Sequence, residues 1–215
     1  MMPACRIMTR LVMSAIGGAL GLSALAGCAS FPDQRLPRYT DEQIVPGDAK
    51  PSIDYDVKVF LSEEEYPAAA VPGLQKRVDH ILGRSRLFSN VRVRSVAETG
   101  NKAEPYHLSI TIRDESRIKH GIWGGLAFAV TVMIFPLQID DDFVLLVDVT
   151  EGGQVIKHYE YRDAMETWVE LFLIVMTPTH SQPAVTRAVL ENMLMNFLHD
   201  LAKDKILTGG ATGTG

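Results

Sequence analysis

Six histidines and a run of three aspartates are the side chains of this sequence best suited to bind a metal. The histidines are His80, His107, His120, His158, His180 and His199. No two of them lie within four residues of each other, so the paired ligands that one helix face offers to zinc are absent. Asp140–Asp142 has the oxygen ligands that a hard cation prefers, but such a run is more often the solvated start of a strand. We therefore predict no metal site.

Nucleophilic catalysis has little support in the residue pattern. The sequence contains no G-x-S-x-G elbow, no H-E-x-x-H pair, no P-loop and no Rossmann glycine pattern. Ser109, Asp148 and His158 are the types of a catalytic triad, but any sheet can bring such a trio together by chance. We predict no catalytic residue and no enzymatic activity.

The clearest chemistry belongs to the thiol of Cys28, which directly follows Leu25, Ala26 and Gly27. Two arginines, Arg6 and Arg10, precede an uncharged stretch over residues 11–24. That stretch is shorter than the roughly 20 residues of a membrane-spanning helix and is typical of the core of a secretory signal.

The run Leu25-Ala26-Gly27-Cys28 resembles the lipobox of bacterial lipoproteins, before whose cysteine signal peptidase II cleaves. The resemblance implies a diacylglycerol on the Cys28 thiol and an acyl chain on its freed amine, which together exceed what stable anchoring needs. We expect no other cofactor. Cleavage removes Cys5 and leaves a mature chain with one cysteine and no disulfide.

Membrane sorting is suggested by the residues after Cys28. Aspartate there resembles an inner-membrane retention signal in well-studied Gram-negative bacteria, but here Ala29 follows, with no aspartate in the next two positions. We therefore predict a lipid anchor on the periplasmic face of the outer membrane.

Length and charge limit what the protein binds. The 215 residues, 47% hydrophobic and 22% charged, suffice for one domain plus attachments. A net charge of −5 argues against a nucleic-acid partner. Four clustered arginines oppose this balance and form either a solvated edge or a site for an anionic partner such as lipid headgroups or glycan. They are Arg84, Arg86, Arg92 and Arg94.

Hydrophobic spacing predicts the elements that must position these residues. Alternation predicts strands over 53–61, 91–94 and 106–113 and a hairpin over 143–161, with a turn at 63–65. Helical spacing predicts helices over about 71–82 and 183–205. The expected fold class is α+β, with a single mixed or antiparallel sheet of about five strands, helices on one face, and additional apolar helical or hairpin segments.

This pattern divides the chain into four regions. Residues 1–27 are expected to be a signal peptide, and 28–51 the lipidated cysteine followed by a Pro-rich tether. Residues 52–207 are expected to form the periplasmic domain, and 208–215 a flexible tail.

Two apolar runs are unusual for a domain of this size. Gly121–Ile139 contains no charge, and Leu171–Met176 is a second apolar run. Either both are buried against the second face of the sheet, or they contact the membrane or the apolar surface of a partner. In the second case the contact residues are Trp123, Phe128, Phe135, Trp168 and Phe172.

The succession of Tyr55–Leu61, Leu87–Val93 and Tyr106–Ile112 around one helix is similar in arrangement to the amino-terminal domain of TolB and to small lipoproteins that assist polysaccharide or curli export. We predict a non-catalytic accessory or scaffold subunit of an envelope assembly, which contacts the membrane through its anchor and binds an envelope protein or a second copy of itself. The alternatives are a membrane-inserting oligomer that forms part of a channel and a carrier that shelters a lipid.

Overall fold

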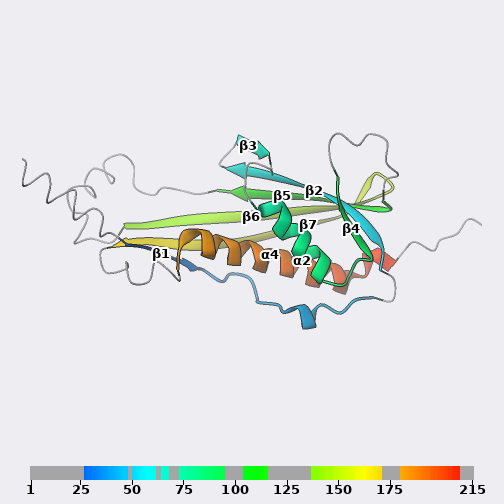
Figure 1. Ribbon diagram of the computed structural model, residues 1–215, viewed down its shortest axis with the longest axis horizontal. Coiled ribbons are helices and arrows are strands. Elements are labelled where there is room, and N and C mark those ends of the chain that lie inside the picture. The colour runs from blue at the N-terminus through cyan, green and yellow to red at the C-terminus, as the bar shows by residue number, and fades with distance from the viewer. Residues whose placement is uncertain are drawn as a thin grey trace, which may run out of the picture. The chain divides into compact units, whose positions relative to one another are not determined.

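The computed structural model describes residues 27–47, 50–61, 64–67, 73–94, 104–115, 137–170 and 180–208 (Figure 1). The strands are β1 (Gly27–Pro32), β2 (Ser52–Leu61), β3 (Glu64–Pro67), β4 (Asn90–Val93), β5 (Tyr106–Asp114), β6 (Leu137–Glu151) and β7 (Gln154–Glu170). The α-helices are α2 (Leu74–Arg84) and α4 (Gln182–Asp204), and two 3-10 turns, η1 (Asp41–Gln43) and η4 (Ile206–Thr208), complete the described elements.

All seven described strands belong to one mixed sheet. The strand order is β1-β7-β6-β5-β2-β3, and β4 also pairs with β2. β2 runs parallel to β4 and β5 and antiparallel to β3, while β5 and β6 are antiparallel. The predicted α+β class with a mixed sheet is confirmed. The sheet has seven strands instead of about five, because β1 and β3 come from segments that the sequence pattern assigned to a tether and a turn.

The strand β3 corrects the turn predicted at residues 63–65. Glu64 and Glu65 pair with Leu61 and Phe60 of β2 in antiparallel register. All four of these side chains lie at least partly in solvent. Charged side chains are common on edge strands, where they discourage pairing with other chains, so an acidic run does not distinguish a turn from an edge.

The predicted alternation of β5 is confirmed by burial. Tyr106, Leu108, Ile110 and Ile112 are at most 4% exposed, whereas the residues between them are half-buried. The parallel register with β2 places Tyr55 beside Leu108, and the Tyr55 hydroxyl reaches the helix α2. This apolar face of the sheet therefore forms the core.

Both helices cover that same face. The helix α2 buries Leu74, Val78, Ile81 and Leu82. The helix α4 buries eight apolar side chains, namely Val185, Val189, Met193, Leu194, Met195, Phe197, Leu198 and Leu201. An ion pair of 2.6 Å between Arg84 and Glu191 joins the two helices side by side. The prediction of helices on one face is thus confirmed.

Two tyrosines of β7 fasten α4 to the sheet. Tyr159 donates a hydrogen bond to Asp204 at 2.9 Å, and Tyr161 donates one to Asp200 at 2.8 Å. Burial raises the pKa of both phenols, and the neighbouring carboxylates raise it further. The phenols therefore remain hydrogen-bond donors throughout the physiological pH range.

The chain divides into two compact units that the sequence pattern did not predict. The first unit consists of Met1–Phe31, Ile118–Asp140 and Glu166–Val185, and the second consists of Pro32–Arg117, Asp141–Met165 and Thr186–Gly215. The strands β6 and β7 contribute residues to both units because they are longer than the predicted hairpin.

Candidate functional site

Cys28, the residue predicted to carry the lipid, lies at the start of β1 and is exposed with a free thiol. Of the preceding lipobox-like residues, Gly27 opens β1, while Leu25 and Ala26 lie outside the described residues. The next two residues, Ala29 and Ser30, are fully buried. Cys28, the predicted lipidation site, is therefore followed directly by buried residues of the fold.

The strand β1 is held in place by contacts of Ser30 and Phe31. The Ser30 backbone N–H donates to the carbonyl of His180 at 2.7 Å, and the Ser30 and Thr167 hydroxyls share a buried hydrogen bond of 2.8 Å. The Phe31 ring packs on the His180 ring with 5.0 Å between centroids. These residues all belong to the first unit.

Only one of the five predicted contact residues is described by the structure. Trp168 lies in β7, next to Thr167, and is half-buried with its indole N–H directed at Glu166 at 3.4 Å. The other four, Trp123, Phe128, Phe135 and Phe172, lie outside the described residues, as do most of the two apolar runs. The described end of the first run, residues 137–139, forms strand in β6.

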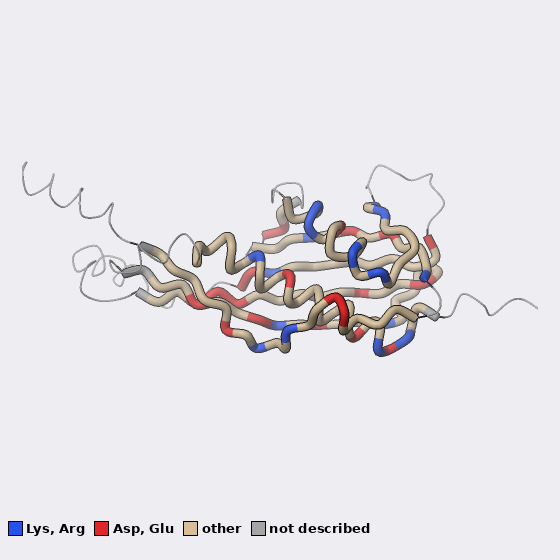
Figure 2. The backbone as a smooth tube through the Cα atoms, turned by 60° about the horizontal axis from the view of Figure 1, so that its bottom comes forward, with Lys and Arg blue, Asp and Glu red and all other residues tan. Residues whose placement is uncertain are grey.

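The two units differ sharply in the charge of their sequences, and Figure 2 marks the charged residues that lie in the described part of the chain. From Cys28 onward the first unit has 47 residues, of which only Lys119, Asp140, Glu166 and Glu170 are charged. The second unit carries 41 charged residues in 141. The predicted lipidation site therefore belongs to the charge-poor unit.

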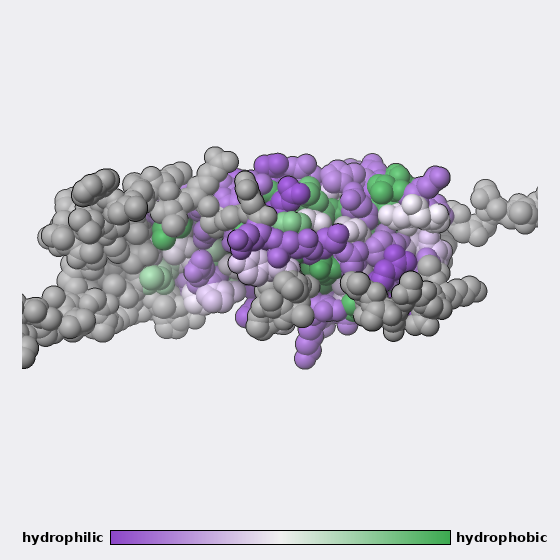
Figure 3. All heavy atoms as spheres, turned by 90° about the horizontal axis from the view of Figure 1, so that it is seen from above, coloured by the Kyte–Doolittle hydropathy of each residue, from purple (hydrophilic) through white to green (hydrophobic). Residues whose placement is uncertain are grey.

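Large exposed hydrophobic side chains are few and scattered in the described part of the chain. They are Val45, Leu61, Tyr66, Val155 and Ile156. Seen from above, hydrophilic residues dominate the coloured surface, and hydrophobic ones form small separate patches (Figure 3). Scattered residues of this kind are normal on a protein surface, so they do not indicate a docking patch.

Residues 33–44, which we call the strap, pack along α4. The Asn196 side chain donates to the Pro37 carbonyl at 2.8 Å, and the Asn192 side chain donates to the Leu36 carbonyl at 3.4 Å. The Tyr39 ring stacks on His199 at 3.8 Å between centroids.

Further contacts hold the two ends of the strap. The Asp33 N–H donates to the Ala164 carbonyl at 2.8 Å, and the Arg35 N–H donates to the buried Asp163 carboxylate at 3.2 Å. Ile44 is only 3% exposed. The predicted tether therefore packs against the domain, because the buried Asn196 and the half-buried Asn192 of α4 donate hydrogen bonds to its carbonyl groups.

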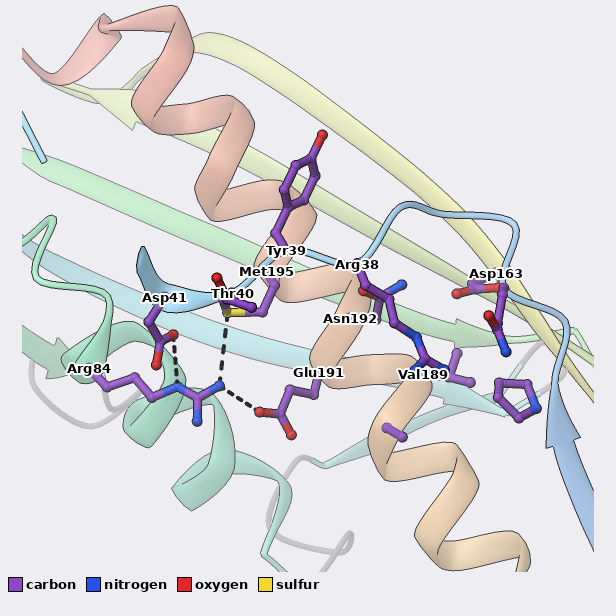
Figure 4. A pocket seen from close by; sticks show the side chains of 13 residues that line it. Arg38, Tyr39, Thr40, Asp41, Arg84, Asp163, Val189, Glu191, Asn192 and Met195 are labelled. Carbon is purple, nitrogen blue, oxygen red and sulfur yellow. Dashed lines mark hydrogen bonds and ion pairs between the residues drawn. The ribbon is translucent and has the colours of Figure 1, made fainter. Parts of the chain in front are cut away.

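A cavity of about 440 Å³ lies between the strap, α2 and α4 (Figure 4). Arg84 crosses one end and forms ion pairs with Glu191 at 2.6 Å and with Asp41 at 3.3 Å. Asp163, at 2% exposure, lines the other end. The lining therefore combines charged side chains at both ends with apolar ones such as Val189 and Met195.

A second cavity, of about 520 Å³, lies where the end of the strap meets the last turn of α4. Its lining includes Val45, His199, Lys203 and Lys205. Neither cavity contains a residue that the sequence pattern singled out for lipidation or membrane contact.

Three of the four clustered arginines form ion pairs. Besides Arg84, Arg92 pairs with Glu104 at 3.3 Å and Arg94 pairs with Asp54 at 3.0 Å. These pairs favour the interpretation of a solvated edge with acidic neighbours over a site for an anionic partner.

A partly buried polar cluster, which sequence reasoning missed, surrounds His107. Its Nδ1 lies 2.6 Å from Asp54 and its Nε2 lies 2.7 Å from Asp56. The hydrogen bond to Asp56 raises the pKa of His107; burial opposes this effect, and Asp54 adds to it. Burial acts to raise the pKa of Asp56, but the His107 hydrogen bond and charge outweigh it and the pKa is lowered.

This His107 cluster is unsuited to general base catalysis. Both ring nitrogens are held by carboxylates, so neither is directed at a hydroxyl nucleophile. The only signal in the sequence is the presence of polar residues at alternate positions on β2 and β5, and this pattern does not reveal that Asp54 and His107 lie opposite each other.

The trio of Ser109, Asp148 and His158 is only partly assembled. His158 Nδ1 lies 2.6 Å from Asp148, and both side chains are largely exposed. Ser109 lies opposite Asp148 in the β5–β6 register, but its hydroxyl is hydrogen-bonded to Asp56. A nucleophile–base pair is therefore not formed.

Asp140 and Asp142, the outer two of the three aspartates, have different partners. Asp142 pairs with Arg35 at 2.9 Å, and Asp140 accepts a hydrogen bond from Gln138 at 3.0 Å. Among the described residues, no group of three His, Cys, Asp or Glu side chains is arranged to hold a metal ion.

Of the helices that the structure describes, neither α2 nor α4 combines the length and apolar character needed to cross a bilayer.

No family model matches the chain, and no curated protein sequence matches it either. Among solved structures, a minor lipoprotein from Acinetobacter baumannii is 10% identical with a TM-score of 0.44, covering 73% of this chain and 94% of that chain. The PelC dodecamer from Paraburkholderia phytofirmans is 14% identical with a TM-score of 0.34, covering 82% and 97%. A DUF330 protein from Xanthomonas campestris is 13% identical with a TM-score of 0.31, covering 76% and 91%. Because all three TM-scores lie below 0.5, no property of these proteins is transferred to this chain.

Proposed function

We propose that this protein is a lipoprotein, anchored through lipid on Cys28 to the periplasmic face of the outer membrane, that acts as a non-catalytic accessory or scaffold subunit of an envelope assembly. The observation that carries the proposal is the lipobox-like run Leu25–Cys28, whose cysteine is exposed at the start of β1.

The local structure is compatible with processing at this cysteine. Cleavage before Cys28 removes Gly27 from β1 but keeps Ser30, whose backbone and side chain supply the contacts to His180 and Thr167. The thiol is already accessible, so its acylation needs no rearrangement of the sheet.

The accessory role is supported by the polar clusters, which satisfy one another within the fold. His107 is held by two carboxylates and Arg84 by two others, and these contacts connect strands, helices and strap. Groups used in this way stabilise a scaffold instead of meeting a substrate.

Mass spectrometry of the amino-terminal peptide tests the anchor. In a Gram-negative host we expect the mature chain to begin at Cys28 and to carry the mass of a diacylglycerol plus an acyl chain. Cys28→Ser abolishes the added mass and cleavage by signal peptidase II, whereas the matched control Cys5→Ser leaves both unchanged. An unmodified Cys28, or cleavage at another residue, would contradict the proposal.

Membrane separation and gene deletion test the location and the role. We expect the wild-type protein in the outer-membrane fraction. We expect deletion in the native host to produce an envelope defect that the wild-type gene corrects and the Cys28→Ser gene does not. Inner-membrane sorting would refute the location, and equal correction by both genes would refute a role that depends on the anchor.

The low charge of the first unit favours a second candidate, a membrane-inserting oligomer. Residues 29–215 produced without Cys28 distinguish the two by light scattering after a size-exclusion column. A monomer that is soluble without detergent contradicts insertion, whereas a defined oligomer that requires detergent supports it and contradicts the simple scaffold.

A further inference from the structure

We propose that the lipid on Cys28 holds the first unit directly against the bilayer, with no spacer between the anchor and the sheet. This inference rests on the proposed lipidation and adds an orientation to it. The bilayer-facing surface is then the part of the first unit around the start of β1, and its partner is the lipid surface.

The chain between the anchor and the fold is very short. Ala29, the residue after Cys28, is 0% exposed, and Ser30 is also 0% exposed. Consecutive Cα atoms are about 3.8 Å apart, so fixed structure begins within about 4 Å of the residue that carries the lipid.

The start of β1 is held in place by several contacts. Ser30 is bonded through its backbone to His180 and through its hydroxyl to Thr167, at 2.7 and 2.8 Å. The Phe31–His180 ring contact adds to these bonds. These interactions join β1 to β7 and to the residues that precede α4. The strand β1 is therefore part of the fold and does not act as a flexible linker.

The Pro-rich segment is placed where it does not act as a spacer. It follows β1 instead of preceding it, and its residues 33–44 are packed as the strap. Because the segment comes after β1 in the chain, it does not separate the lipid from the sheet.

The sequence of the first unit contains few charged residues. Between Cys28 and its end, the first unit has four charged residues in 47, so bringing it to the bilayer desolvates few ions. Trp168 is half-buried and directly follows Thr167, whose hydroxyl is hydrogen-bonded to Ser30 of β1. Tryptophan is enriched where a protein meets the headgroup region of a membrane.

The cysteine and tryptophan content of the chain allows the contact between the first unit and the bilayer to be tested. From Cys28 onward the chain has one cysteine, so this thiol can be coupled to maleimide-bearing lipid in preformed vesicles. Both tryptophans, Trp123 and Trp168, belong to the first unit, and Trp123→Phe leaves Trp168 as the single reporter. We expect Trp168 emission to fall in vesicles of brominated phosphatidylcholine relative to unbrominated vesicles.

Two matched variants separate attachment geometry from any affinity of the unit for lipid. Cys28→Ser combined with Gly215→Cys couples the same protein through its other end. A Gly/Ser insertion of about 20 residues after Cys28 adds about 25 Å of flexible chain. We expect the loss of emission to disappear in both variants.

Each outcome decides the inference. Quenching with direct Cys28 coupling alone supports it. No quenching with direct coupling overturns it, and equal quenching in all three proteins overturns it in favour of a unit that binds lipid by itself. Because the coupling is chemical, the result is independent of whether a cell lipidates Cys28, which mass spectrometry decides separately.

Discussion

Replacing His107 with alanine removes the side chain that joins Asp54 to Asp56. The histidine is 16% exposed and Asp54 is 7% exposed, so both contacts, at 2.6 and 2.7 Å, are largely shielded from water. Hydrogen bonds to charged groups contribute about 1.5–3 kcal/mol each, and the variant also leaves two carboxylates without the cation between them. We expect His107→Ala to lower the free energy of unfolding by about 3 kcal/mol at pH 6.

The cost of His107→Ala depends on pH in a defined direction. The pKa of His107 is raised in the folded state, so the stability it contributes is fully present below about pH 6.5 and is lost as the pH rises through the folded pKa. The pKa of Asp56 is lowered, so its contribution is present above about pH 3.9 and is lost as the pH falls through its folded pKa. The difference between wild type and variant is therefore largest near pH 6 and shrinks in alkali.

Urea unfolding of the mature chain, followed by far-UV circular dichroism at several pH values, measures this difference. His158→Ala is the matched control, because His158 lies at the same 2.6 Å from Asp148 but its side chain is 54% exposed. Exposed ion pairs contribute about 0–1 kcal/mol. If the two variants lose equal stability, or if the effect of His107→Ala does not change with pH, the reasoning from burial is wrong.

Three further substitutions test the strap, the attachment of α4 and the core. Asn196→Ala removes the donor to Pro37 and should cost about 1–3 kcal/mol and speed amide hydrogen exchange in the strap, which exchange mass spectrometry measures. Tyr161→Phe removes the hydrogen bond to Asp200 and should lower the free energy of unfolding by about 1 kcal/mol in urea titrations. Leu108→Ala empties a fully buried position and should cost about 2–5 kcal/mol in the same titrations.

Each of these substitutions has a result that would count against it. If amide hydrogen exchange in the strap is unchanged in Asn196→Ala, the other contacts of the strap are sufficient to hold it. For Tyr161→Phe the control is Tyr66→Phe, whose hydrogen bond to Glu64 is exposed; equal losses would contradict the importance of burial. For Leu108→Ala the control is Leu61→Ala, since Leu61 is 41% exposed; equal losses in these two variants would contradict the placement of Leu108 in the core.

The periodicity of side chains predicted much of the fold. The alternation over 106–113 and the helical spacing over 183–205 closely match β5 and α4. Periodicity succeeds there because the backbone geometry of a strand or helix is local, so the buried side can be identified without knowing what covers it. The packing of residues 33–44 on Asn192 and Asn196 was not predictable in this way, because those residues lie more than 150 positions away.

The sequence by itself singled out Cys28 as the predicted lipidation site, since a lipobox-like run depends only on neighbouring residues. The tertiary structure alone decided what surrounds that position and which polar groups meet. His107 lies opposite Asp54 because β2 and β5 pair in one particular parallel register, and a shift of one residue would turn His107 to the other face. The charge-poor unit also consists of three separate stretches of chain, and only folding brings such stretches together.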